Sequence, residues 1–239
     1  MGIIGGADGP TQIVVAAAGV TQVSGGMLAG CLALSALVAY LLGSLEFGII
    51  VSKLLYGDDV RNHGSGNAGM TNVLRTFGKK AAALVLVGDM GKGIVSVVLV
   101  RTLAQSVFYT AYPNGVDLGA VAAFFAVIGH LFPLYFKFKG GKGVAVAAGT
   151  ILVTNPTIFL VLVLIFLIVV GGTRIVSLAS ITGAVSYPIL TLLYCLVNGQ
   201  SVVVNTLFAV CMAALVIFMH RSNIQRLREG TEYRFGEKK

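Results

Sequence analysis

The sequence has few charged residues and no tryptophan. Charged residues make up 11% of its 239 residues, whereas soluble domains carry about 25%. Hydrophobic residues reach 56% and the mean hydropathy is +0.92, which excludes a water-soluble fold. Without tryptophan, tyrosine and charged side chains must mark the membrane interfaces.

Cysteine is also scarce, and the spacing that a metal site needs is missing. Cys31, Cys195 and Cys211 lie inside apolar runs, without the spacing of a disulfide framework or of metal ligands. They are interpreted as small core residues, and we predict no metal and no cofactor. The only adjacent acids are Asp58 and Asp59, which argues against a polyprenyl-phosphate transferase that depends on Asp-rich magnesium motifs.

Long apolar runs are abundant, and they set the fold class. A membrane-spanning helix needs about 20 mostly apolar residues, so the runs predict an all-α, polytopic membrane protein with about seven transmembrane helices. The expected segments are 27–55, 79–105, 116–136, 143–153, 155–171, 175–196 and 202–220. The fourth is too short to cross alone. It is either a half-helix among neighbours or continuous with the fifth through a break at Asn155-Pro156.

The positive charges are distributed unevenly along these segments. With seven crossings, all of the 17 Lys and Arg residues except Lys92 and Arg101 fall on one side, which the positive-inside rule assigns to the cytoplasm. The N-terminus is then outside and the C-terminus cytoplasmic. If the fourth and fifth segments were one helix, Arg174 and the tail would change sides, so seven is favoured. The net charge of +8 fits anionic lipid and an anionic substrate, and not nucleic acid.

Residues 1–26 differ from the rest of the chain. They form a Gly-rich N-terminal leader of unknown role, without the positive region that precedes the apolar part of a usual cleavable signal peptide. We expect a loosely ordered leader or a short extracytoplasmic helix. Residues 27–239 are expected to form a single membrane-integral domain.

The first cytoplasmic loop, DDVRNHGSGNAGMTNVLRTFGKK, has the composition of an anion cradle. Glycines free backbone N–H groups to converge, hydroxyl and amide side chains add donors, and arginine offers a planar fork to phosphate oxygens. The candidate residues are Gly64, Ser65, Gly66, Asn67, Thr71, Asn72 and Arg75. Gly64, Gly66 and Gly69 also match the spacing of a dinucleotide-binding loop, but that motif needs a βαβ unit, which is not expected here.

The second loop, FKFKGGKGVAVAAG, places one lysine among glycines where a helix begins. A helix N-terminus beside an ammonium group is a strong anion site, so Gly140, Gly141, Lys142 and Gly143 are candidates. A nucleotide-binding P-loop would need Ser or Thr directly after this lysine, and the sequence has Gly143 there.

Other polar residues border the expected helices. His220 and Asn223, three residues apart at the end of the last helix, and Ser180 near the sixth are further candidates, and Ser177 is close by. His63 is expected to be structural.

Two acids lie inside apolar runs. Asp89 and Lys92 are expected to pair at i, i+3, whereas Glu46 has no obvious partner in the sequence.

Three motifs together resemble one family. GSGNAGMTNVLR, GGKGVA and the closing H-x-x-N-I-x-R-L-x-x-G-x-E are similar to those of the bacterial acyl-phosphate:glycerol-3-phosphate acyltransferases, from about Met27 to Phe235. The resemblance implies a seven-helix enzyme of the bacterial plasma membrane with its active site facing the cytoplasm. It also implies transfer of an acyl group from acyl phosphate to glycerol-3-phosphate, giving 1-acyl-glycerol-3-phosphate and inorganic phosphate.

The resemblance also assigns roles to residues. Ser65, Thr71, Asn72 and Arg75 match loop residues that bind phosphate or position the donor, and Lys142 matches a lysine that contacts substrate phosphate. Ser180, His220 and Asn223 match residues that line the substrate site. The expected catalytic residues are Ser65, Asn72, Arg75 and Lys142. The chain departs from the family pattern at Leu45-Glu46, at Met70 and at Val146.

Two questions stay open from the sequence. The main alternative function is a transporter or channel for phosphate-bearing solutes, which the short fourth segment and Asp89 would suit. Against it, the anion-binding groups lie in cytoplasmic loops and no inverted repeat is visible. The oligomeric state is not indicated, and a monomer is compatible with the sequence.

Overall fold

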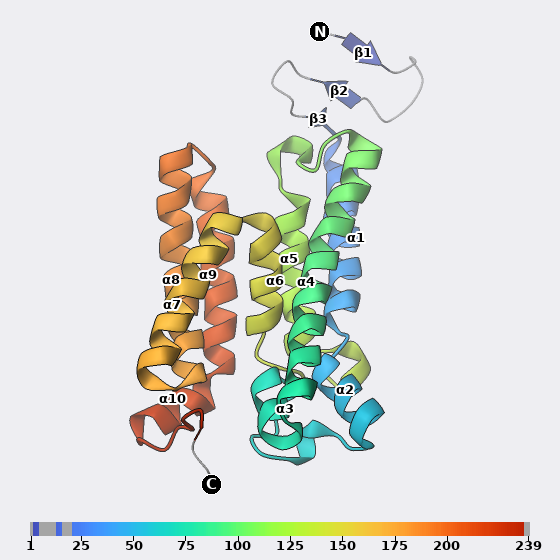
Figure 1. Ribbon diagram of the computed structural model, residues 1–239. Helices are drawn as coiled ribbons and strands as arrows, with labels where there is room; N and C mark the ends of the chain where they lie inside the picture. The colour runs from blue at the N-terminus through green and yellow to red at the C-terminus, as the bar shows by residue number, and fades with distance from the viewer. Residues whose placement is uncertain (1, 5–12, 16–20, 237–239) are drawn as a thin grey trace.

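The computed structural model describes residues 2–4, 13–15 and 21–236. Ten α-helices form nearly all of the described chain (Figure 1). Their bounds are α1 Gly25–Gly43, α2 Phe47–Tyr56, α3 Met70–Phe77, α4 Lys79–Phe108, α5 Leu118–Leu131, α6 Val144–Thr154, α7 Pro156–Thr173, α8 Val176–Asn198, α9 Val202–Met219 and α10 Arg221–Arg228.

The leader contains a small antiparallel sheet, so the expectation of an all-α chain is wrong there. Strands β1 (Gly2–Ile4), β2 (Ile13–Val15) and β3 (Thr21–Gln22) pair in the order β1-β2-β3. The β-branched residues of β1 and β2 favour strands over a helix. Of the two alternatives expected for the leader, the short helix is wrong for these strand residues, and most of the remaining leader lies outside the described residues.

The apolar runs form the expected helices. Among the residues that the structure describes, six stretches are long and apolar enough to cross a membrane, with α1 and α2 together making the first, Gly25–Tyr56. The remaining expected segment, the fourth, is α6, whose 11 residues span about 16 Å, roughly half of a bilayer core. Asn155 caps α7 by accepting a hydrogen bond from the Ile158 N–H (3.0 Å). The chain turns at Asn155-Pro156, and α6 and α7 are separate helices that run in opposite directions (Figure 1).

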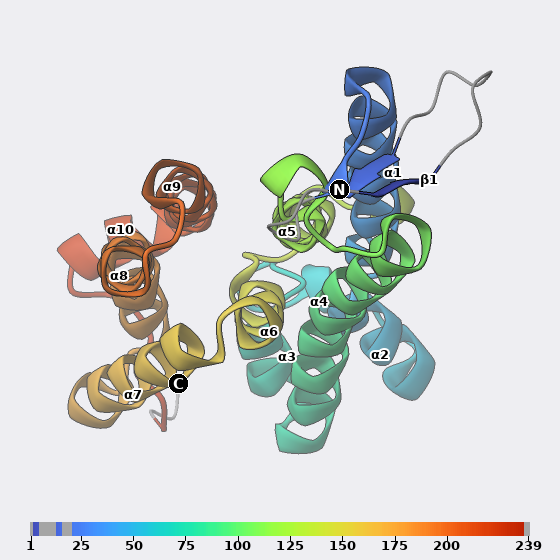
Figure 2. The same cartoon turned by 90° about the horizontal axis from the view of Figure 1, so that it is seen from above.

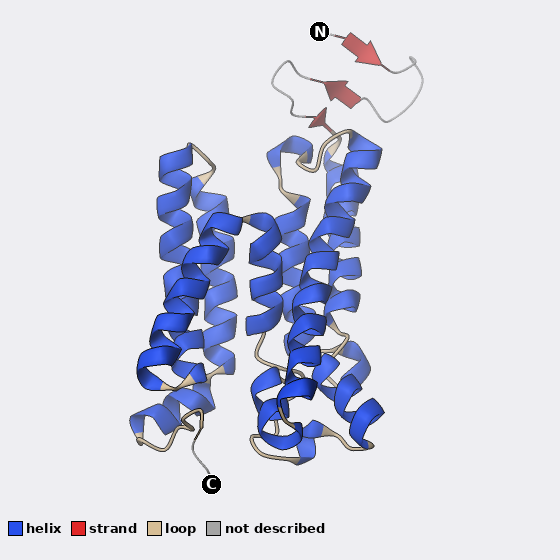
Figure 3. Cartoon of the chain, in the orientation of Figure 1, coloured by secondary structure: helices blue, strands red, loops and turns tan. Residues whose placement is uncertain are grey.

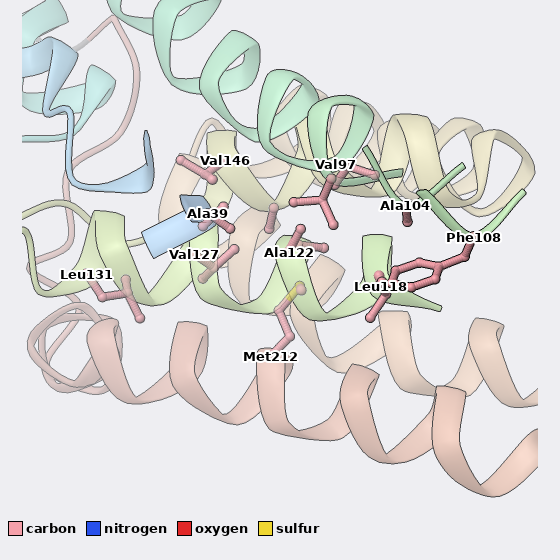
Figure 4. Packing of buried hydrophobic residues seen from close by; sticks show 14 of the residues in the cluster. Ala39, Val97, Ala104, Phe108, Leu118, Ala122, Val127, Leu131, Val146 and Met212 are labelled. Atoms are coloured by element: carbon pink, nitrogen blue, oxygen red, sulfur yellow. The ribbon is translucent and has the colours of Figure 1, made fainter. Parts of the chain in front are cut away.

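The helices differ greatly in burial. Within their apolar stretches 61% of residues are buried for Leu118–Phe136, which includes α5, but only 6% for α7. Seen from above, α7, α8 and α9 lie on one side of α6, and α5, α4 and α1 lie on the other (Figure 2). Apolar side chains of α1, α4, α5, α6 and α9 form the main core (Figure 4). A helix with few buried apolar residues is expected to face lipid.

Glycines let several of the core helices pack backbone against backbone. A Cβ added to Gly43 of α1 would lie 2.2 Å from the carbonyl oxygen of Ala126 in α5. A Cβ on Gly149 of α6 would lie 2.2 Å from the Met90 carbonyl oxygen in α4. Close approach of helices through small residues is the usual packing mode in membranes, and here it fixes α5 and α6 against α1 and α4.

The polar segments gather at one end of the bundle. The short helices α2, α3 and α10 lie at the end that holds the C-terminus, and the strands lie at the opposite end (Figures 1 and 3). The first loop, the second loop (residues 137–143, hereafter the glycine–lysine loop) and the tail are therefore neighbours, although they are far apart in the sequence.

Candidate active site

A pocket of about 360 Å³ lies where the polar end meets the helices. Its polar lining comes from the first loop and α3, the glycine–lysine loop, the start of α8 and the C-terminal segment. Its apolar lining comes mainly from α6, α7, α8 and α9. The predicted site residues that line it are Ser65, Asn67, Thr71, Asn72, Arg75, Lys142, Gly143, Ser180, His220 and Asn223. One pocket therefore collects the three motifs.

Asn72 organises the first loop from within. It is buried, its side-chain oxygen accepts a hydrogen bond from the Ser65 N–H (3.0 Å), and its amide donates to the carbonyls of Val60, His63 and Asn67 (each 3.0 Å). Gly64 has a φ of 55°, and a Cβ there would lie 2.3 Å from the Asn72 oxygen. The side-chain amide of Asn72 is therefore fully used in shaping the loop. The exposed Ser65 is among the residues that line the pocket.

Arg61 holds this loop against the second one. Arg61 binds Asp59 with two hydrogen bonds from its guanidinium (2.8 and 3.0 Å) and donates to the carbonyls of Phe136 and Lys139 (both 3.2 Å). The hydrogen bonds from Arg61 lower the pKa of Asp59 to about 2, so this pair stays charged at neutral pH. His63 binds Asp58 at 2.5 Å, in line with its expected structural role.

Lys142 projects from a glycine turn into the pocket. Gly143 adopts a φ of 84° just before α6, a conformation that glycine takes without strain. The ammonium of Lys142 donates a hydrogen bond to the side-chain oxygen of Asn223. Burial lowers the pKa of Lys142 to about 8, and the nearby charges of Glu232, Arg226 and Arg75 change it less. The amine keeps its charge at neutral pH, and a bound anion would stabilise that charge further.

The tail closes the polar end around one carboxylate that the sequence analysis did not select. Glu232 is buried and accepts hydrogen bonds from Asn223 (2.8 Å), Ser177 (2.9 Å) and Arg226 (2.7 Å). Burial acts to raise the pKa of Glu232, but these hydrogen bonds outweigh it and the pKa is lowered. Glu232 is the last residue of the quoted tail motif, so its position in that motif was the available signal.

The remaining predicted residues take different places. His220 is buried, with its Nδ1 2.8 Å from the Val216 carbonyl oxygen, and the hydroxyl of Ser180 donates to the Val176 carbonyl (3.0 Å). Gly64, Gly66, Gly140 and Gly141 are not among the residues that line the pocket; they shape the two loops. The pocket lining also includes Arg226 and Tyr233, which the sequence analysis did not select. The Arg75 guanidinium stacks 3.9 Å from the centre of the Tyr233 ring.

The charge and polarity of the pocket change along its length. Three cations, Arg75, Lys142 and Arg226, line the pocket together with two carboxylates, Glu232 and Asp89. Asp89 is paired with Lys92, so the polar end around Glu232 has excess positive charge. Further in, the α7 lining is apolar, with Phe159, Leu162, Val163 and Phe166. A pocket of this shape fits a molecule with an anionic head and a hydrocarbon chain.

A family sequence profile shows which known family this chain belongs to. The profile described as "Glycerol-3-phosphate acyltransferase" matches residues 33–230. The chain belongs to this family. The expected family is confirmed, and with it the expectation that the chain is an acyltransferase enzyme.

Individual relatives agree with this assignment. The chain is 45% identical over 204 residues to a glycerol-3-phosphate acyltransferase of Neisseria meningitidis serogroup A, covering 84% of this chain and 96% of the relative. It is 42% identical over 207 residues to one of Clostridioides difficile, covering 85% and 95%. Residues 1–32, which include the whole leader, lie outside the family match.

Solved structures agree as well. The crystal structure of PlsY (YgiH), an integral membrane glycerol 3-phosphate acyltransferase in its glycerol 3-phosphate form, superposes with a TM-score of 0.73. The two chains are 39% identical, and the match covers 86% of this chain and 96% of that one. The lysophosphatidic acid form of PlsY gives a TM-score of 0.71 at 37% identity. An integral membrane fold is therefore shown for the matched part.

Proposed function

We propose that this enzyme transfers an acyl group from acyl phosphate to the hydroxyl of glycerol-3-phosphate, giving 1-acyl-glycerol-3-phosphate and inorganic phosphate. The observation that carries the proposal is the pocket, in which Arg75, Lys142 and Arg226 stand at one end of an apolar channel. Both substrates are anions, and the donor adds a long hydrocarbon chain. The relatives solved with glycerol 3-phosphate and with lysophosphatidic acid support the acceptor and the product.

The chemistry makes modest demands on the protein. The acceptor hydroxyl oxygen attacks the acyl carbon, the bond from that carbon to the phosphate oxygen breaks, and phosphate leaves with the electron pair. The hydroxyl proton passes to a phosphate oxygen of a substrate. Acyl phosphate is a mixed anhydride with a good leaving group, so a strong protein base is not needed. The protein must bring together two anions that repel each other and stabilise the charge that develops.

Each loop supplies a part of that work. Lys142 and Arg75 bind substrate phosphates, and the Ser65 hydroxyl with the neighbouring loop N–H groups donates hydrogen bonds to them. Asn223 holds Lys142 through the contact described above. Asn72 acts through the loop shape that its hydrogen bonds enforce. Thr71, Ser180 and His220 complete the wall against which the substrates pack.

We also propose seven membrane crossings, with the N-terminus outside and the active site at the cytoplasmic face of the plasma membrane. The supporting observation is that every described Lys and Arg except Lys92 and Arg101 lies outside the long spans or near their polar end. The antiparallel pair α6 and α7 then supplies the fourth and fifth crossings. Single cysteines placed at Asn198 and Arg228 test this topology in intact spheroplasts: a membrane-impermeant maleimide should label only the first.

The decisive experiment for the activity is turnover by the purified enzyme. Acyl phosphate and glycerol-3-phosphate are supplied with a metal chelator present, and release of inorganic phosphate is followed together with the lipid product. We expect equal amounts of phosphate and 1-acyl-glycerol-3-phosphate. Acyl-CoA and acyl carrier protein thioesters serve as control donors and should give no product. Flux of glycerol-3-phosphate into proteoliposomes without a donor would instead favour a transporter.

A further inference from the structure

Four ionisable side chains meet below the glycine–lysine loop, in a cluster that the proposed chemistry does not use. Glu46 comes from the break between α1 and α2, Asp89 and Lys92 come from α4, and His130 comes from the end of α5. Their exposed fractions are 0%, 1%, 5% and 2%. The expected Asp89–Lys92 pair is present at 2.9 Å. Glu46, which has no obvious partner in the sequence, finds two partners in space.

Lys92 and His130 are the centre of this cluster. The Lys92 ammonium donates to the Leu45 carbonyl oxygen (2.5 Å), which the break after α1 leaves free, and lies 2.8 Å from His130 Nδ1. His130 Nδ1 also lies 2.9 Å from a Glu46 oxygen. The imidazole ring is therefore held on one edge by groups from two other segments.

The charges of the cluster nearly cancel. Two carboxylates and one ammonium would leave one negative charge buried at membrane depth, which is costly. His130 Nδ1 is within hydrogen-bond distance of both the Lys92 ammonium (2.8 Å) and the Glu46 carboxylate (2.9 Å). The imidazole is therefore fixed by charge as well as by shape.

The opposite side of His130 supports the loop that carries Lys142. The Gly141 N–H donates to the His130 carbonyl oxygen (3.1 Å). A Cβ on Gly140 would lie 2.0 Å from that oxygen, and one on Gly141 would lie 2.1 Å from His130 Nε2. Gly140 and Gly141, the two residues before Lys142, thus pack directly against His130. A rotation of its ring would therefore displace the loop.

We propose that the Glu46–Asp89–Lys92–His130 cluster positions Lys142 for the reaction. The cluster fixes the His130 ring, and the loop that packs on this ring places Lys142 in the pocket. This rests on the proposed function for its kinetic consequences. His130 and its partners act through Lys142, and their removal moves the ammonium away from the substrate phosphate. A displacement of about 1 Å in a catalytic group costs about 10²-fold in rate.

A double-mutant cycle tests this role. His130→Leu removes the ring's polar contacts and His130→Asn keeps a polar group near the position of Nδ1, each made in the wild-type and in the Lys142→Met background. Arg101→Leu is the matched control, because it breaks the ion pair with Asp117 (2.6 Å) on the part of α4 that does not line the pocket. Two quantities are measured for the purified protein: affinity for glycerol-3-phosphate by thermal-shift titration, and kcat and KM for acyl transfer.

The expected pattern is coupling between His130 and Lys142. His130→Leu should lower kcat/KM about 10²-fold and weaken glycerol-3-phosphate binding, while in the Lys142→Met background it should add less than about twofold. His130→Asn should recover most of the loss. Arg101→Leu should lower the melting temperature with no loss of affinity. Equal losses from His130→Leu in both backgrounds, or the same loss of affinity in Arg101→Leu, would overturn the proposal.

Two further outcomes keep the test decisive. If His130→Leu does not fold, Glu46→Gln takes its place in the same cycle. We then expect a smaller loss of kcat/KM and the same coupling to Lys142→Met. If the wild type binds glycerol-3-phosphate but releases no phosphate from acyl phosphate, the proposed donor is wrong. The binding arm of the cycle then still decides the role of His130.

Discussion

Two lysines of this enzyme are both largely removed from water, and their surroundings differ in a way that separates stability from function. Lys92 lies between Asp89, Glu46 and His130, with distances of 2.9, 3.6 and 2.8 Å from its ammonium. Lys142 has the neutral side chain of Asn223 as its direct partner. The charge of Lys92 is balanced inside the protein, whereas that of Lys142 is left for an incoming anion.

The comparison shows how the same side chain serves two purposes a short distance apart. A balanced ion cluster holds segments together, and removing one member leaves another charge unpaired. A buried cation without a carboxylate in contact costs stability, and an ionisable group in such an unfavourable environment is characteristic of functional sites. Each of the following predictions tests one side of this contrast.

The largest effect is expected from Lys92→Met. This change leaves the Asp89 and Glu46 carboxylates buried without their cation, which typically costs about 3–5 kcal/mol. We expect a large fall in melting temperature, measured in detergent with a thiol-reactive dye in a Cys31→Ala, Cys211→Ala background, where the dye reports exposure of the buried Cys195. Asp89→Asn introduced with Lys92→Met should recover part of it. If the single variant melted like the wild type, Lys92 would not be the centre of a balanced cluster.

Lys142→Ala should have the opposite profile. Loss of one electrostatic contact to the transition state costs about 10²–10³ in rate, while the protein should fold as well as the wild type because a poorly compensated charge has been removed. Phosphate release and melting temperature, measured on the same preparation, check both parts. Near wild-type activity in the purified variant would remove Lys142 from the catalytic groups.

The pH dependence sharpens the same contrast. Burial lowers the pKa of Lys142 to about 8 from an ordinary 10.5, so the free enzyme loses this charge as the pH rises through 8. We expect kcat/KM to fall by up to about tenfold per pH unit above that point. Lys142→Arg should lose this alkaline limb because arginine stays charged. A wild-type profile that stays flat up to pH 10 would contradict the assignment.

The sign of the stability effect follows from the same shift. Between pH 8 and 10.5 the unfolded chain holds the Lys142 proton more tightly than the folded chain does, so this group makes the folded state more stable as pH rises through that window. Activity and stability therefore change in opposite directions over this range. Melting curves of wild type and Lys142→Ala across the window isolate the contribution of this residue.

The smallest effect is expected from deleting residues 2–20. They precede the family match at 33–230, and the strands lie at the end of the bundle opposite the short helices of the polar end (Figure 1). We expect kcat/KM within about twofold of the full chain, measured by phosphate release, because no loop of the pocket is touched. A larger loss would show that the leader acts on the catalytic domain.

Most of the fold could be predicted from the sequence because a bilayer allows few kinds of membrane-spanning structure. Apolar length and the positive charges indicate the spans, and the break at Asn155-Pro156 was visible as a helix stop. The motif residues came together because short loops at the same end of a bundle are neighbours. The site was also well indicated by chemistry, since glycine, hydroxyl and cationic residues were concentrated in two loops.

The contacts that were missed join distant parts of the chain. Glu46 and His130 are 84 positions apart, and nothing local indicates that a helix break and the end of α5 meet. Glu232 lies in a polar tail, where its burial by Ser177, Asn223 and Arg226 depends on how that tail folds back. In the leader, the alternation that would indicate strands is short and interrupted by glycine.

The sparse burial of α7 has a consequence for how a lipid product leaves. Only Ile158 of this helix is fully buried, yet Phe159, Leu162 and Phe166 line the pocket, so a single helix separates the reaction chamber from the surrounding acyl chains. A small sideways shift of α7 would open the apolar part of the pocket to the surrounding lipid. The newly acylated molecule can then diffuse into the bilayer without ever exposing its tail to water.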